Sequence, residues 1–168
     1  NRANGFQKVL FIRPGGIGDA VLLVPVLVAL REKHPDATID VLAETRNAAI
    51  FSMCPSVDNV MLYDQGGLLP TIRSKYDVVI DTEQWHRLSA VVARLIKSRM
   101  KIGYGTNERK KLFTHVVNYS HEQYELNSFF DLLLPLGIEA PENHPDSFLT
   151  IPPSTRKSAC QLLEPLRE

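Results

Sequence analysis

The amino-acid sequence predicts an α/β protein with a Rossmann-like, doubly wound and mostly parallel sheet. Short β-branched segments alternate along the chain with longer segments whose apolar residues recur at helical spacing. The interior of segment 77–81 (DVVID) is entirely apolar, as in a central parallel strand that is buried on both faces. Strands that alternate with helices pair in parallel through right-handed crossovers. The 168 residues are enough for about one domain.

The first half of the chain contains four predicted strands joined by three predicted helices. β-branched and apolar residues mark the strands, and turn residues separate them from the helices. The first helix includes the apolar run AVLLVPVLVAL, which Pro25 interrupts and which is only about half as long as a membrane span. The predicted strands are 9–12, 38–43, 59–63 and 77–81, and the predicted helices are about 19–33, 47–53 and 68–74.

The second half continues the alternation and ends in helices. We predict a helix over 88–97, strands over 101–104 and 115–118, and a long helix over 122–136. A proline-rich loop over 140–148 precedes a last helix that starts after residue 150. The long helix is predicted from one apolar stripe and is expected to stop at Gly137. The stripe consists of Leu126, Phe129, Phe130, Leu133 and Leu136.

The composition excludes several classes of protein. A hydrophobic content of 44% and a charged content of 23% are typical of a soluble globular chain. Nineteen basic residues balance nineteen acidic ones, so no overall field attracts nucleic acid. Cys54 and Cys160 lie too far apart for a metal knuckle or a redox pair, which predicts reduced thiols in a cytoplasmic protein. No carboxylate–histidine cluster has metal-ligand spacing, so we expect no metal site and no cofactor.

A glycine-rich turn follows the first predicted strand. Ligands of doubly wound sheets bind beyond the carboxyl ends of the strands, which selects loops 13–19, 44–46, 64–67, 81–87 and 103–111. Gly15, Gly16 and Gly18 follow a strand and open a helix, so backbone N–H groups and the positive helix end would face an anion such as a diphosphate. The alternative is that these glycines only make a tight turn.

Asp19 allows two interpretations. Aspartate is a good helix cap, and this role explains most aspartates at such positions. Asp19 also lies at the strand edge where ligands bind, beside an anion-binding turn, and its carboxylate could accept a proton from a substrate hydroxyl.

A dinucleotide-binding fingerprint is a weaker alternative for the same turn. Gly16 and Gly18 match its first two glycines, but Val21 stands where the third glycine belongs. Glu44 could imitate the ribose-binding acid, although it follows the turn later than the usual spacing.

The opening segment KVLFIRPGGIGDAVLLVPVLVALREKHPDATIDVLA resembles that of the lipopolysaccharide heptosyltransferases, glycosyltransferase family 9. The segments YDVVID, KIGY and the LGI that ends the long helix follow in the family's order. Family members begin with a strand, an arginine, a small-residue pair, an apolar residue, Gly-Asp and a proline-interrupted helix. The matching positions here are Arg13, Gly15, Gly16, Ile17, Gly18, Asp19 and Pro25.

The resemblance implies the acceptor-side, amino-terminal half of a two-domain GT-B glycosyltransferase. Residues 1–152 would form that domain, and residues 153–168 would begin the helix and linker toward a second domain that binds most of the nucleotide-sugar. The implied reaction transfers heptose from ADP-heptose to the lipopolysaccharide inner core with inversion. We expect this fragment to fold but to be inactive alone. A non-catalytic, nucleotide-binding Rossmann-like module is the alternative.

The resemblance also implies partners and site residues. The partners are ADP-heptose and an anionic lipopolysaccharide acceptor, without nucleic acid, in a cytoplasmic protein with transient contact to the inner membrane. Asp19 would be the catalytic base, and Arg13 would bind substrate together with the glycine turn.

Two arginines are expected to hold anionic groups of the acceptor, with a solvated surface role as the alternative for each. Arg87 matches a basic position of the family, and Arg109 lies in the basic run 108–111. His86 offers a titratable group in the pocket, or else covers the sheet edge. Glu83 and Gln84 depart from the glutamine and glycine that the family usually has there.

Overall fold

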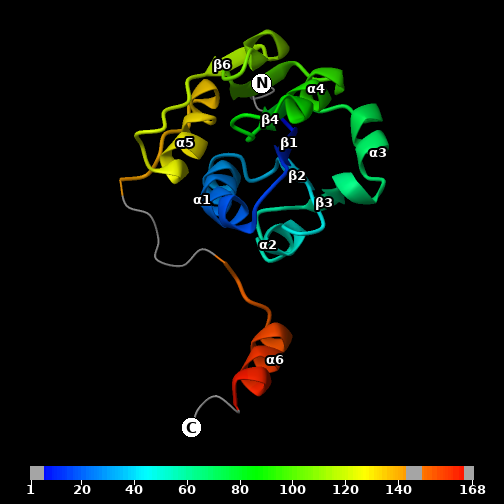
Figure 1. The fold of residues 1–168 in the computed structure, drawn as a ribbon, viewed down its shortest axis with the longest axis vertical. Coiled ribbons are helices and arrows are strands. Elements are labelled where there is room, and N and C mark those ends of the chain that lie inside the picture. The colour runs from blue at the N-terminus through cyan, green and yellow to red at the C-terminus, as the bar shows by residue number, and fades with distance from the viewer. Residues whose placement is uncertain (1–5, 143–148, 165–168) are drawn as a thin grey trace.

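A six-stranded, all-parallel sheet forms the body of the protein in the computed structural model, which describes residues 6–142 and 149–164 (Figure 1). The strand order is β3-β2-β1-β4-β5-β6, so the chain reverses its direction of winding between β1 and β4. The predicted doubly wound architecture is confirmed. The strands are β1 Lys8–Arg13, β2 Thr38–Ala43, β3 Asn59–Leu62, β4 Val78–Asp81, β5 Met100–Tyr104 and β6 His115–Val117.

Helices cover both faces of the sheet. Val9 and Phe11 of β1 pack in one core with α1, α2 and α5, whereas the alternate residues Leu10 and Ile12 pack in a second core with α3 and α4. This two-sided burial is the reason that the strands are continuously apolar. The helices are α1 Ile17–Lys33, α2 Ala48–Ser52, α3 Leu68–Arg73, α4 Arg87–Leu95, α5 Glu125–Asp131 and α6 Pro153–Leu163.

The long helix predicted over 122–136 is shorter than expected. Its regular part is α5, and a separate 3₁₀ turn, η3 Leu134–Leu136, follows. Pro135 has no N–H to donate and disfavours a helical conformation of the residue before it, so the α-helix does not continue through it. Gly137 then ends the segment with a φ of +73°, a conformation that glycine adopts without strain.

Two 3₁₀ turns were not predicted, η1 Tyr63–Gln65 after β3 and another after β5. Residues of the basic run form a 3₁₀ turn, η2 Arg109–Leu112, which packs against α4. Two left-handed residues, Asn107 with φ 48° and Glu108 with φ 60°, turn the chain inward just before it. The backbone at these two positions therefore directs Arg109 into the protein instead of into solvent.

The carboxyl-terminal helix α6 stands clear of the sheet (Figure 1). It starts close to the predicted position, and all of its residues are exposed. The domain boundary at residue 152 stays a prediction, and most of the predicted proline-rich loop lies outside the described residues. Across residues 6–142 and 149–164, no helix is long and apolar enough to cross a membrane.

Close packing at Gly103 of β5 gives a test of this fold. A methyl group at Gly103 would lie 2.6 Å from Cε1 of Phe113, which overpacks the core. We expect Gly103→Ala to lower the free energy of unfolding by about 1–3 kcal/mol in urea titrations. Gly18→Ala is the matched control because a methyl group there meets nothing within 4 Å. Equal effects of the two substitutions would contradict the packing at Gly103.

Candidate functional site

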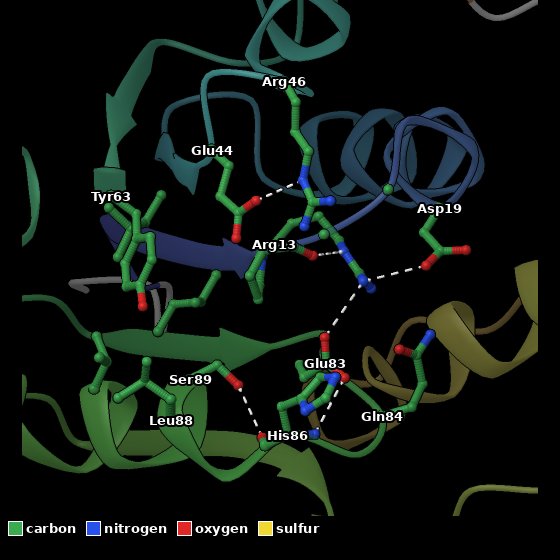
Figure 2. A pocket seen from close by; sticks show the side chains of 16 residues that line it. Arg13, Asp19, Glu44, Arg46, Tyr63, Glu83, Gln84, His86, Leu88 and Ser89 are labelled. Atoms are coloured by element: carbon green, nitrogen blue, oxygen red, sulfur yellow. Dashed lines mark hydrogen bonds and ion pairs between the residues drawn. The ribbon is translucent and has the colours of Figure 1, made fainter. Parts of the chain in front are cut away.

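A pocket of about 470 Å³ opens at the carboxyl ends of β1, β2 and β4, where ligands of doubly wound sheets bind (Figure 2). Its floor is apolar, and polar side chains from four loops and helix ends surround it. The predicted residues Arg13, Gly15, Gly16, Asp19 and His86 all line the pocket. The other lining residues are Ile12, Pro14, Leu42, Glu44, Arg46, Tyr63, Glu83, Gln84, Leu88, Ser89 and Val92.

Arg13, the last residue of β1, is the centre of the site's hydrogen bonds. Its side chain is only 2% exposed. Nε donates to the carbonyl of Pro14 at 2.7 Å, and Nη1 donates to the carbonyl of Thr82 at 2.9 Å. Nη2 lies 3.2 Å from Asp19 Oδ2 and 3.6 Å from Glu83 Oε2. One buried cation therefore joins the loops after β1 and β4 to the start of α1.

Asp19 lies in the first turn of α1, but it is not the helix cap. Gly16 occupies the N-cap position, and no side chain caps the helix there. The Asp19 carboxylate instead points to Arg13 and is 40% exposed, so it faces the pocket (Figure 2). Among the described residues, only Oδ2 has a hydrogen-bond partner. Oδ1 is left to face a ligand.

The glycine turn is held by a buried asparagine that the sequence analysis missed. Gly15 adopts a φ of +104°, and a side chain there would be both strained and 3.2 Å from Arg13 Nη2. Asn47 is fully buried, and its Nδ2 donates to the carbonyls of Arg13 and Gly15, each at 3.1 Å. Its Oδ1 accepts from the backbone N–H of Glu44 at 3.0 Å. Asn47 thereby links the loops after β1 and β2.

Glu83 shapes the loop after β4. Its Oε1 accepts from the backbone N–H groups of Trp85 at 3.0 Å and His86 at 3.2 Å, while Oε2 faces Arg13. A carboxylate suits this position because every group that it meets is a donor. His86 lies at the N-cap of α4 with its side chain exposed to the pocket (Figure 2).

Arg46 is a pocket cation that the sequence analysis did not select. Its Nε donates to Glu44 Oε2 at 2.6 Å, and its side chain is 62% exposed. This contact also occupies the carboxylate that the dinucleotide-binding alternative needs for a ribose. Arg46 could have been selected by its position, because Glu44 and Arg46 both belong to the loop after β2, one of the five loops where ligands are expected.

The other predicted binding residues lie outside the pocket lining. Gly18 is exposed on α1. Arg87 is exposed on α4, where it forms an ion pair with Glu108 and donates through Nε to the carbonyl of Asn107 at 3.0 Å. Arg109 is completely buried. The expectation that Arg109 meets an acceptor phosphate is not supported by this placement.

Arg109 instead forms a second buried ion pair, at the end of β4. Its Nη2 lies 2.5 Å from Oδ2 of Asp81, and Nη1 donates to the carbonyl of Glu83. Ser89 Oγ and the N–H of Glu83 also donate to the Asp81 carboxylate, at 3.0 and 3.1 Å. Burial raises the pKa of Asp81 to about 6, although Arg109 and these hydrogen bonds favour its charged form.

The pocket is slightly acidic. Three carboxylates, Asp19, Glu44 and Glu83, line it together with two guanidinium groups, Arg13 and Arg46. The described residues hold no group of three or more His, Cys, Asp or Glu that could bind a metal ion. The arrangement offers an exposed carboxylate on a rigid support, beside the amino terminus of a 17-residue helix. It can orient a hydroxyl group and accept its proton.

Solved glycosyltransferase structures contain the fold of this chain over about half of their own length. A glycosyltransferase family 9 protein from Veillonella parvula matches 96% of this chain and 50% of its own, with a TM-score of 0.80 and 16% identity. Heptosyltransferase WaaC of E. coli, solved with ADP-2-deoxy-2-fluoro heptose, matches 83% of this chain and 51% of its own, with a TM-score of 0.73 and 19% identity. No protein-family model matches the chain.

The sequence identifies the relatives more closely. Lipopolysaccharide heptosyltransferase 3 of Escherichia coli strain K12 is 32% identical over 140 residues, which cover 72% of this chain and 40% of that protein. The chain is therefore a sequence relative of the lipopolysaccharide heptosyltransferases, as its opening motif implies. It spans about two fifths of the length of the curated relatives that it matches.

The buried pair of Asp81 and Arg109 gives a pH-dependent prediction. Arg109→Met removes the counter-charge of a buried carboxylate, which costs about 3–5 kcal/mol of stability. The pKa of Asp81 then rises further, so folded Asp81 binds its proton more tightly than unfolded Asp81 does. The loss of stability relative to the wild type is therefore largest well above pH 6 and shrinks as the pH falls to about 6, where Asp81 of the wild type takes up its proton as well.

Urea unfolding of both proteins across this pH range measures the difference. Arg87→Met is the matched control, because the ion pair of Arg87 with Glu108 is exposed and contributes little. A loss in Arg109→Met that does not change with pH would show that Asp81 is not the group left uncompensated.

Proposed function

We propose that this chain is the acceptor-binding half of an inverting glycosyltransferase that moves heptose from ADP-heptose to the lipopolysaccharide inner core. The observation that carries the proposal is Asp19, a half-exposed carboxylate fixed by buried Arg13 at the mouth of the pocket. The sequence likeness to lipopolysaccharide heptosyltransferases supplies the substrate class. The WaaC structures with ADP and with an ADP-heptose analogue support a nucleotide-sugar donor.

In the proposed reaction, Asp19 accepts the proton of an acceptor hydroxyl. The hydroxyl oxygen forms a bond to the anomeric carbon of heptose, on the face opposite the diphosphate. The bond between that carbon and the diphosphate oxygen breaks, and ADP leaves with the electron pair. The proton remains on the Asp19 carboxyl group until solvent takes it up. The reaction so written uses no cofactor.

Arg13 orients the Asp19 carboxylate. It holds Oδ2 of Asp19 and leaves Oδ1 to meet the hydroxyl. The backbone of Gly15 and Gly16 and the amino terminus of α1 are then placed near the leaving diphosphate, which the positive helix end stabilises. The precise turn geometry depends on Asn47, so this residue acts as a positioning residue.

We assign the acceptor's anionic groups to exposed side chains at the rim of the pocket that can donate hydrogen bonds to them. Arg46 lines the pocket, and Arg87 and His86 lie at the start of α4. The carboxylates of Asp19, Glu44 and Glu83 would repel an acceptor phosphate, whereas a rim arginine binds it in a bidentate manner. A cytoplasmic protein in contact with the inner membrane would meet both the nucleotide-sugar and the lipid-linked acceptor.

Replacement of Asp19 tests the catalytic assignment in a full-length protein that carries this domain. Asp19→Asn keeps an oxygen that accepts from Arg13, so the melting temperature should stay near that of the wild type. The variant loses the proton acceptor, and kcat for heptose transfer should fall by about 10²–10⁴-fold. Asp19→Ala should lose the same activity and some stability as well. An Asp19→Asn variant with a normal melting temperature and a near-normal kcat would contradict the assignment of Asp19 as the catalytic base.

Replacement of Arg87 tests the acceptor side. Arg87→Ala should raise the acceptor KM about fivefold, equivalent to about 1 kcal/mol of binding. kcat and donor affinity should stay nearly unchanged, because binding to a remote phosphate is the same in ground and transition states. Arg31→Ala is the control, since Arg31 pairs with Asp58 elsewhere on the surface. A weaker donor affinity in Arg87→Ala would show that Arg87 binds the donor and not the acceptor.

A further inference from the structure

The outer face of α4 carries an apolar stripe that no described residue covers. Leu88, Val91 and Leu95 are 58%, 42% and 60% exposed, at the i, i+3 and i+7 spacing of one helix face. Trp85, in the loop that leads into α4, is 55% exposed. The opposite face of α4 already packs on the sheet through Ala90, Val92 and Ala93. The stripe is therefore a second apolar face on a helix whose core face is satisfied.

Basic residues border this stripe. Residues 85–111 contain eight Lys or Arg and one Glu, although the whole chain has nineteen of each sign. Arg94 lies on α4 itself, and Lys110 and Lys111 lie on η2, which packs against α4. The field of Arg94 contributes, after burial, to a lowered pKa of Lys101. The exposed cations among residues 85–111 are Arg87, Arg94, Lys97, Arg99, Lys110 and Lys111.

The apolar stripe and the basic residues beside it together favour one kind of binding partner. An apolar stripe with Trp and Leu, set in a rim of cations, matches the lipid–water interface of an anionic bilayer, where side chains enter the headgroup region and cations meet phosphate groups. Glu108, the one carboxylate among residues 85–111, is already paired with Arg87. A protein partner for this surface would need a similarly dense array of acidic groups around an apolar ridge.

We propose that the outer face of α4, together with η2, docks this chain on an anionic lipid surface. α4 then lies in the plane of the interface, with Leu88, Val91 and Leu95 at headgroup depth. This proposal does not rest on the transferase function. The two are nevertheless compatible in space, since Leu88 belongs both to the stripe and to the lining of the pocket (Figure 2). The pocket would open beside the docked membrane.

Vesicle sedimentation tests the proposal with the 168-residue chain and without any substrate. The chain should bind vesicles of phosphatidylglycerol and phosphatidylcholine, bind phosphatidylcholine alone weakly, and lose binding as salt screens the cations. Leu95→Glu should lower the partition coefficient at least about tenfold, because insertion of a leucine side chain is lost. Arg94→Gln and Lys111→Gln should each lower it about fivefold.

Matched controls lie on the other face of the sheet. Leu134 of η3 is 51% exposed and Lys33 ends α1, and both elements belong to the opposite helix layer (Figure 1). Leu134→Glu and Lys33→Gln should bind vesicles as the wild type does. Unchanged melting temperatures would show that all variants are folded.

Several outcomes would overturn the proposal. The first is no vesicle binding, and the second is binding that the α4 variants do not weaken. The third is self-association of the chain that Leu95→Glu abolishes while vesicles are ignored, which would make a second copy the occupant. The fourth is binding by this chain but not by a full-length protein that carries it, which would mean that another domain covers the stripe. None of these results bears on heptose transfer.

Discussion

The buried guanidinium of Arg13 is the constraint on which the rest of the site depends. A charge that is 2% exposed must be fully paired, and the partners available at the end of β1 are the Pro14 and Thr82 carbonyls and the carboxylates of Asp19 and Glu83. These partners belong to three different places: Pro14 to the loop after β1, Asp19 to the first turn of α1, and Thr82 and Glu83 to the loop after β4. Satisfying one cation therefore sets the path of the loop after β1, the start of α1 and the loop after β4 at once.

A second buried ion pair, between Arg109 and Asp81, holds the same loop after β4 that Arg13 binds. Arg109 and Asp81 are both fully buried at the end of β4, and Arg109 also binds the carbonyl of Glu83. The Glu83 side chain faces Arg13, so both cations contact the loop after β4. A movement of that loop would break the contacts of Arg13 with Thr82 and Glu83 and that of Arg109 with Glu83, and buried polar contacts of charged groups are costly to lose. The pocket wall that carries His86 and Ser89 is for this reason expected to be rigid.

Local pattern predicted most of the fold and only part of the site. All six strands were predicted because continuous apolar runs and turn residues are local signals. The glycine turn and Asp19 could be selected because they follow a strand and open a helix. Arg109 was selected as a phosphate-binding residue, and its burial could not be predicted, because it depends on two left-handed residues and on a carboxylate 28 positions away. Asn47 gave no signal either, since its role appears only when the loops after β1 and β2 meet.

The charges of this domain are divided between two places, and the division bears on how a lipid-linked sugar would bind. Asp19, Glu44 and Glu83 line the pocket with two arginines that are already engaged with them, so an acceptor phosphate close to these carboxylates would be repelled. Of the exposed cations that form no ion pair in the described part of the chain, Arg94, Lys110 and Lys111 lie outside the pocket on α4 and η2. An acceptor that carries both hydroxyl and phosphate groups would therefore place a hydroxyl at Asp19 and keep its phosphates at the rim. Its lipid would extend along the same side as the apolar stripe, where the bilayer is proposed to lie. The carboxylates of the pocket thus favour acceptance of a proton from a hydroxyl group, while the basic residues of α4 and η2 attract the anionic groups of an acceptor.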